Sequence, residues 1–86
     1  MIFISLIKFK NKAKEVADTG NKILKNPPKG VKIISTYWTL GKFDSVWIYE
    51  APSEKEAMEL GIAIGEVARS QTMVALTREQ ALGLLD

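Results

Sequence analysis

Residues 39–52, TLGKFDSVWIYEAP, decide the fold expected for this 86-residue chain. Gly41 with Lys42 supplies a hairpin turn, and Pro52, which has no backbone N–H to donate, ends the strand Asp44–Ala51. The centre of that strand, VWIY, places large apolar side chains on both faces of a sheet. A small domain must therefore cover apolar groups on two sides of this strand.

The flanking sequence supplies the remaining elements. Apolar residues alternate with a period of two near the start, and a stripe of helical spacing follows, which ends at Asn26, Pro27 and Pro28. Ser53 with Glu56, and Thr77 with Gln80, have the spacing of capping boxes at helix starts. The expected elements are strands at Ile2–Ile7, Val31–Leu40, Asp44–Ala51 and Ala68–Leu76, helices that begin at Ala13 and after Ser53, and a short terminal helix at Arg78–Leu85.

The element order β-α-β-β-α-β is the split β-α-β pattern, in which two helices cover one face of four antiparallel strands. We therefore predict one α+β, ferredoxin-like domain over residues 1–86, with one sheet face left open. A domain of 86 residues buries only about 60 to 65% of its unfolded surface, so oligomerisation would add stability.

The number of residues in the hairpin loop decides which side chains share a face. An even loop places Trp38 on the side of Trp47, and an odd loop places it beside Val46 and Ile48. We favour the even loop, with Ile34 on the side of the tryptophans and Ile33 opposite. Several aromatic and aliphatic side chains on the open face would exceed the apolar patch usual for a monomer, and a second copy would cover them.

Composition excludes several classes of function. The chain has no cysteine and no histidine, which removes disulfides, thiolate or histidine catalysis and the commonest zinc ligands. Residues 1–42 carry nine lysines against two acidic residues, a net of +7, while residues 43–86 carry three cations against eight acidic residues, a net of −5. No apolar run is long enough to span a membrane, and the expected location is cytoplasmic. No nucleotide-binding loop or acidic metal cluster is present, so no cofactor and no metal are expected.

The hairpin and the helix start after it resemble the GYD family of small α+β proteins. The resemblance runs from about Val31 to Gln80 and is strongest at Leu40, Gly41, Phe43, Asp44, Glu50, Ala51 and Pro52. The family is similar to the dimeric α/β-barrel superfamily, so the resemblance implies a dimer in which two ferredoxin-like sheets face each other. Members of that superfamily include cofactor-free oxygenases, isomerases and ligand-sensing regulators, and fold does not select among these.

Two carboxylates are candidate catalytic groups. Asp44 follows the turn, where aspartate commonly accepts hydrogen bonds from backbone amides, and proton chemistry is the alternative. Glu50 stands near a strand end among apolar neighbours, where partial burial would suit acid–base work. The alternative for Glu50 is a solvated position or an ion pair with Lys32 or Arg69.

The aromatic residues are the candidate ligand-binding groups. Tyr37, Trp38, Trp47 and Tyr49 would line a cavity inside a dimer, with Arg69 holding a carboxylate, or would serve as core and interface anchors with Arg69 in a subunit salt bridge.

These residues lead to three hypotheses of function. The first is a homo-oligomer, either a homodimer or a larger ring of dimers, that binds a small molecule or serves assembly. The second is a cofactor-free isomerase or oxygenase that uses Glu50 or Asp44. The third, nucleic-acid binding, is disfavoured because DSVWIYEA lacks the basic and glycine residues of an RNA-recognition strand.

Overall fold

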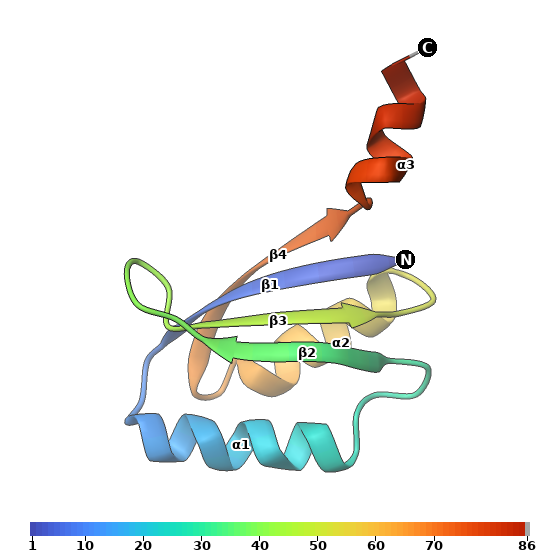
Figure 1. Ribbon diagram of the computed structural model, residues 1–86. Coiled ribbons are helices and arrows are strands. Elements are labelled where there is room, and N and C mark those ends of the chain that lie inside the picture. The colour runs from blue at the N-terminus through green and yellow to red at the C-terminus, as the bar shows by residue number, and fades with distance from the viewer. Residues whose placement is uncertain (86) are drawn as a thin grey trace.

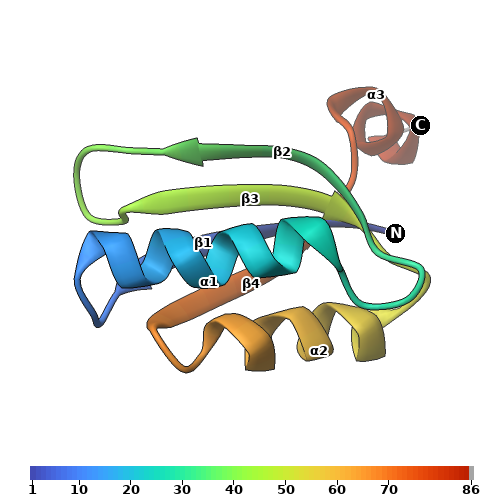
Figure 2. The same cartoon turned by 90° about the horizontal axis from the view of Figure 1, so that it is seen from below.

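The computed structural model describes residues 1–85 and has a four-stranded antiparallel sheet in the order β2-β3-β1-β4. Helices α1 and α2 lie on one face of this sheet, and the other face is uncovered (Figures 1 and 2). The prediction of an α+β, ferredoxin-like fold is confirmed. The elements are β1 (Ile2–Phe9), α1 (Ala13–Lys25), β2 (Lys32–Trp38), β3 (Ser45–Glu50), α2 (Glu54–Ile64), β4 (Ala68–Ala75), α3 (Arg78–Leu82) and the 3-10 turn η1 (Gly83–Leu85).

The core lies between the sheet and the two helices. Strand β1 alternates along its length, with Phe3, Ser5 and Ile7 buried and the residues between them only partly covered. Each helix turns one stripe toward these side chains, with the spacing expected of an amphipathic helix. The buried helix residues are Val16, Gly20 and Ile23 on α1 and Ala57, Leu60 and Ile64 on α2.

The loop between β2 and β3 has an even number of residues, as predicted. Trp38 lies opposite Ser45, so residues 39–44 form the loop and Trp38 shares a face with Trp47. Gly41 has a φ of 109°, which a side chain rarely tolerates, and glycine permits this turn.

The predicted faces of Ile33 and Ile34 are wrong. Ile33 pairs with Tyr49 and Ser35 pairs with Ile48, so Ile34 is an extra residue in a β-bulge. The bulge reverses the alternation on its far side, because one inserted residue shifts the period of two. As a result Ile33 packs against the core, and Ile34 is exposed.

The two predicted capping boxes have different outcomes. At α3 the box forms, since the Thr77 hydroxyl accepts from the Gln80 N–H at 3.1 Å and the Gln80 side chain accepts from the Thr77 N–H at 3.0 Å. At α2 it does not form, because the Ser53 side chain makes no cap to the backbone. Its hydroxyl donates to the carboxylate of Glu56, at 3.1 Å from Oε1. The Ser53 hydroxyl therefore bonds to the Glu56 side chain and not to a backbone N–H of the helix.

The chain leaves the sheet through a projecting segment, residues 76–85, called here the C-terminal arm. No residue of α3 or η1 is buried, and Figure 1 shows both extending away from the end of β4. In Figure 2 the arm lies on the side of the sheet away from α2. Four leucines of the arm are exposed: Leu76, Leu82, Leu84 and Leu85. Within residues 1–85 these leucines therefore keep a large part of their surface in contact with solvent.

Candidate functional site

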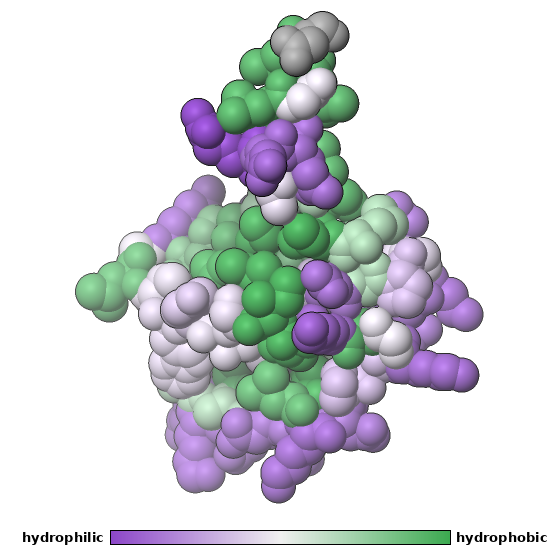
Figure 3. Space-filling model, turned by 45° about the vertical axis from the view of Figure 1, so that its right-hand side comes forward, coloured by the Kyte–Doolittle hydropathy of each residue, from purple (hydrophilic) through white to green (hydrophobic). Residues whose placement is uncertain are grey.

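The uncovered sheet surface, called here the open face, is apolar at its centre. The register places the even-numbered residues of β1 on it, opposite Val46 and Ile48 of β3 and Met73 of β4. Tyr37, which pairs with Val46, adds the one aromatic ring of β2 on this side. Hydrophobic residues gather in the middle of the surface in Figure 3, and more of them lie on the C-terminal arm beyond a hydrophilic cluster at its base. The apolar residues of the open face are Ile2, Ile4, Leu6, Tyr37, Val46, Ile48, Met73 and Ala75.

Charged residues lie at the two ends of the open face. In the sheet register Arg69 lies opposite Lys8 at one end, and Glu50 lies opposite Lys32 and Ile2 at the other. Six residues of β1 separate these ends, which is about 20 Å. An ion pair between Glu50 and Arg69 of one copy is therefore impossible, and no ion pair of either residue is found within residues 1–85. Both side chains are free to meet groups outside the chain.

Trp47 and Tyr49 lie in the core, which agrees with the alternative that they are core anchors and not with a cavity between two open faces. Trp47 is 6 % exposed and Tyr49 is fully buried, because both point toward the helices. The Tyr49 ring stacks on Phe3 with centroids 5.7 Å apart. Its hydroxyl lies 3.0 Å from Ser5 Oγ, which in turn lies 2.8 Å from Thr72 Oγ1. This chain of hydroxyls satisfies polar groups beneath the helices, so Tyr49 has a structural role.

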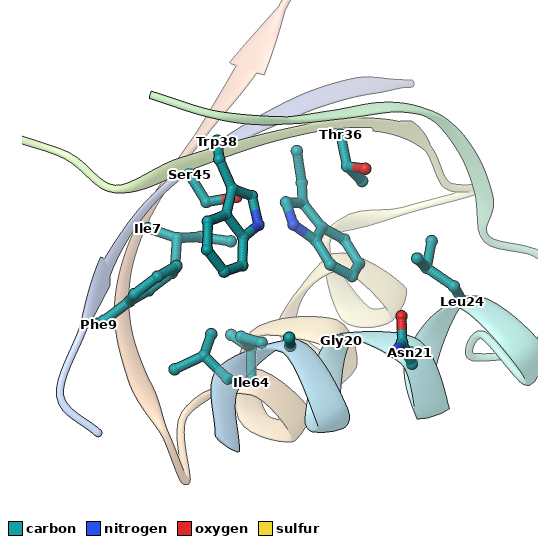
Figure 4. Close-up of a pocket in the computed structure, with 12 residues that line it drawn as sticks. Ile7, Phe9, Gly20, Asn21, Leu24, Thr36, Trp38, Ser45 and Ile64 are labelled. Carbon is teal, nitrogen blue, oxygen red and sulfur yellow. The ribbon is translucent and has the colours of Figure 1, made fainter. Parts of the chain in front are cut away.

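Trp38 lies on the helix-covered side but at the edge strand, where it is 60 % exposed. Its indole stands edge-on to Phe9, with ring centroids 5.2 Å apart. Together with Trp47 and α1 it lines a cavity of about 260 Å³, called here the tryptophan cavity (Figure 4). Thus one pair of predicted ligand-binding residues does meet at a cavity, and that cavity lies beneath the sheet.

Sequence reasoning missed the α1 side of the tryptophan cavity. Ala17, Gly20 and Asn21 form that wall. A Cβ added to Gly20 would lie 3.4 Å from the Trp47 ring, so the helix approaches the indole closely there. The usable signal was a glycine on the apolar stripe of a helix. Glycine weakens a helix interior by about 1 kcal/mol, so its presence there indicates a close contact that a side chain would block.

Asp44 ties the hairpin loop to the end of β1. Its Oδ2 accepts the Phe9 N–H at 2.8 Å and lies 3.7 Å from Lys8 Nζ, while its own N–H donates to the Ile7 carbonyl at 2.8 Å. The amide it satisfies is distant in sequence, whereas the motif suggested a local one. Neither Asp44 nor the exposed Glu50 lines the tryptophan cavity. The structure therefore brings together no catalytic pair from the predicted candidates.

A second hollow of about 380 Å³ lies between α2 and β4, lined by Phe3, Met58, Ile62, Thr72 and Val74 among others.

No group of three acidic side chains able to hold a metal ion occurs in residues 1–85. Over the same residues, no helix has the length and apolar character to cross a bilayer.

A family model described as the GYD domain matches residues 3–85, nearly the whole chain. No significant match is found among curated proteins or among solved structures. The matched region includes the Asp44 hairpin, the sheet and the arm, and it extends the similarity seen around residues 31–80 to both ends of the fold. The chain therefore belongs to the GYD domain family.

Proposed function

We propose that the protein acts as a self-assembling domain that forms a homodimer by packing its open face against that of a second copy. The observation that supports this is the continuous apolar centre of the open face across all four strands, with both long helices on the opposite side. Exposed apolar patches of this size mark interaction surfaces. A second copy of the same surface matches it in chemistry, since an isologous interface is self-complementary.

The area of the open face indicates how such a dimer would be built. Four strands at about 4.8 Å spacing and about seven residues long present roughly 400 Å². A stable interface buries about 800 Å² from each partner, so the sheet alone supplies about half. The C-terminal arm lies on the same side of the sheet and carries four exposed leucines, so it is the segment of this chain that supplies the remainder.

The free charges define the orientation of the proposed pair. If the two-fold axis runs across the strands, the strands of the two copies are antiparallel, and the Arg69 end of one open face lies over the Glu50 end of the other. Both ion pairs of the dimer are then equivalent by symmetry. Complementary charges at the rim fix the register, while the apolar centre supplies most of the affinity.

The other hypotheses gain no support from the geometry. A nucleic-acid platform of this topology needs aromatic rings on its central strands, and here β1 and β3 present Ile4, Leu6, Val46 and Ile48 on the open face. A proton-transfer enzyme needs a carboxylate at a cavity, and Asp44 is bonded to the Phe9 amide.

The test is the mass in solution of the full chain and of two lysine variants, measured by light scattering. The wild type is expected at twice the 9.6 kDa chain mass. Ile4→Lys, at the centre of the open face, is expected to be a folded monomer, because burying an unpaired ammonium opposes association. Met58→Lys, at an exposed apolar position on α2, is expected to stay dimeric.

Circular dichroism on each variant separates loss of assembly from loss of fold. A wild-type monomer at micromolar concentration would contradict the proposal, and so would an Ile4→Lys variant that dimerises as well as Met58→Lys.

A further inference from the structure

The tryptophan cavity lies on the other side of the sheet from the open face, so pairing of two sheets leaves it accessible. Phe9 and Trp38 lie on one side of it, and α1 closes it from below (Figure 4). The nearly buried Trp47 also lines it. Its volume of about 260 Å³ equals the space of roughly nine water molecules. A molecule of two fused rings fits such a space between aromatic walls.

The charge of the lining restricts the class of ligand. Among residues 1–85, no lysine, arginine, aspartate or glutamate borders the cavity, and its other side chains are apolar, hydroxyl or amide groups. A charged ligand would lose its hydration without gaining a counter-charge. The cavity therefore suits a neutral molecule.

A nearly buried hydrogen-bond donor indicates what that molecule must carry. Trp47 is 6 % exposed and lines the cavity. Within residues 1–85 its indole N–H has no hydrogen-bond acceptor, yet no fully buried side-chain nitrogen or oxygen of that range lacks a partner. The Trp47 Nε1 atom therefore keeps some contact with solvent, and Trp47 lines the cavity. Indole donates and does not accept, so its missing partner is an acceptor.

We propose that the tryptophan cavity binds a small, neutral, planar aromatic molecule that presents a hydrogen-bond acceptor to the Trp47 indole N–H. Trp38, at the mouth, covers one face of the ligand ring, and its exposure permits entry. Ala17 and Gly20 border the cavity on the α1 side with small side chains, and α1 packs closely against the Trp47 ring at Gly20. This site depends on neither the dimer nor the charged ends of the open face.

The test uses quinoline as the probe, because it is neutral, planar and bicyclic and has one ring-nitrogen acceptor. Indole is the matched comparison, since its ring nitrogen donates. Titrations of the ¹⁵N-labelled full chain are expected to show a downfield shift of the Trp47 indole N–H with quinoline, and binding several-fold tighter than that of indole. 2-Naphthoate, which is planar but anionic, is expected to bind more weakly than quinoline.

Two variants and one control locate the site. Trp38→Ala is expected to weaken quinoline binding about five- to tenfold through loss of one aromatic wall. Ala17→Leu is expected to abolish binding by filling the cavity from the helix side. Tyr37→Ala removes the neighbouring aromatic ring, which is 57 % exposed on the opposite face, and is expected to leave quinoline binding unchanged.

No chemical-shift change at millimolar quinoline would overturn the proposal. An unmoved Trp47 signal during binding would do the same, as would a 2-naphthoate affinity above that of quinoline. Since Tyr37→Ala also weakens the proposed dimer, its unchanged quinoline binding would show that the two surfaces are independent.

Discussion

The two faces of the sheet use the same residue types for opposite purposes. On β2, Trp38 points to the helix side and Tyr37 to the open face, and both are more than half exposed. Trp38 borders a cavity that its own chain builds, whereas Tyr37 borders a surface that its own chain leaves uncovered. Exposure alone therefore does not distinguish a cavity residue from a residue of an interaction surface in this fold. What distinguishes them is whether a helix of the same chain packs on that face of the sheet.

The largest effect expected from this difference is in the pair Phe3 and Ile4, adjacent on β1. Phe3→Ala removes a ring buried between sheet and helices, so it should lower the free energy of unfolding by about 3–5 kcal/mol. Ile4→Ala removes a partly buried side chain of the open face, and its cost should fall as the protein is diluted, because it acts on the dimer. Urea denaturation at several protein concentrations measures both. Equal, concentration-independent losses would remove the distinction between the two faces.

A smaller effect is expected at Asp44, which serves the helix-covered half of the molecule by joining the hairpin loop to β1. Asp44→Ala leaves the Phe9 N–H without its acceptor and should cost about 1.5–3 kcal/mol. Asp44→Asn keeps an acceptor oxygen and should recover most of that loss. Thermal unfolding of the three proteins measures the series. If Asn proves as destabilising as Ala, the charge near Lys8 matters more than the bond to the Phe9 amide.

Much of the fold follows from local sequence signals, and the site does not. The order of helices and strands follows from sequence signals that end each element, such as the prolines after α1 and the turn at Gly41. The even hairpin loop follows from the same signals. These features involve neighbours in sequence, where propensity and alternation apply directly.

The faces of individual residues were harder to predict, because they depend on contacts distant in sequence. The bulge at Ile34 reverses the alternation, and no residue type in KIIST marks it. Alternation also could not say which face of β3 the helices cover. A cavity between two open faces would have placed Trp47 and Tyr49 on the open face, but Val46 and Ile48 occupy that face. The tryptophan cavity required the distance between Gly20 and Trp47, which only the folded chain supplies.

The free charges of the open face allow a test of its proposed orientation, with an effect below that of any core change. Glu50→Arg should weaken the dimer, and so should Arg69→Glu, each by about 1 kcal/mol because rim ion pairs contribute little. The double variant exchanges the two charges and should restore wild-type affinity. Sedimentation equilibrium at low salt measures all four proteins. Additive losses in the double variant would mean that the two residues do not meet across the interface.

The smallest expected effect lies on the helix side, at the start of α2. The hydrogen bond from the Ser53 hydroxyl lowers the pKa of the Glu56 carboxyl, since the bond favours the ionised form. A lowered pKa in the folded state stabilises the protein above the carboxyl's ordinary pKa, and this stabilisation is lost as the pH falls through the lowered value. Ser53→Ala should return the pKa of Glu56 toward its ordinary value, and Ser53→Thr, which keeps a hydroxyl, should not. Carboxyl ¹³C titration by NMR measures the three. Identical Glu56 titration curves for the serine and alanine proteins would mean that the Ser53 hydroxyl does not bond to Glu56 in solution. It would then be available to cap the helix backbone, as the sequence motif predicts.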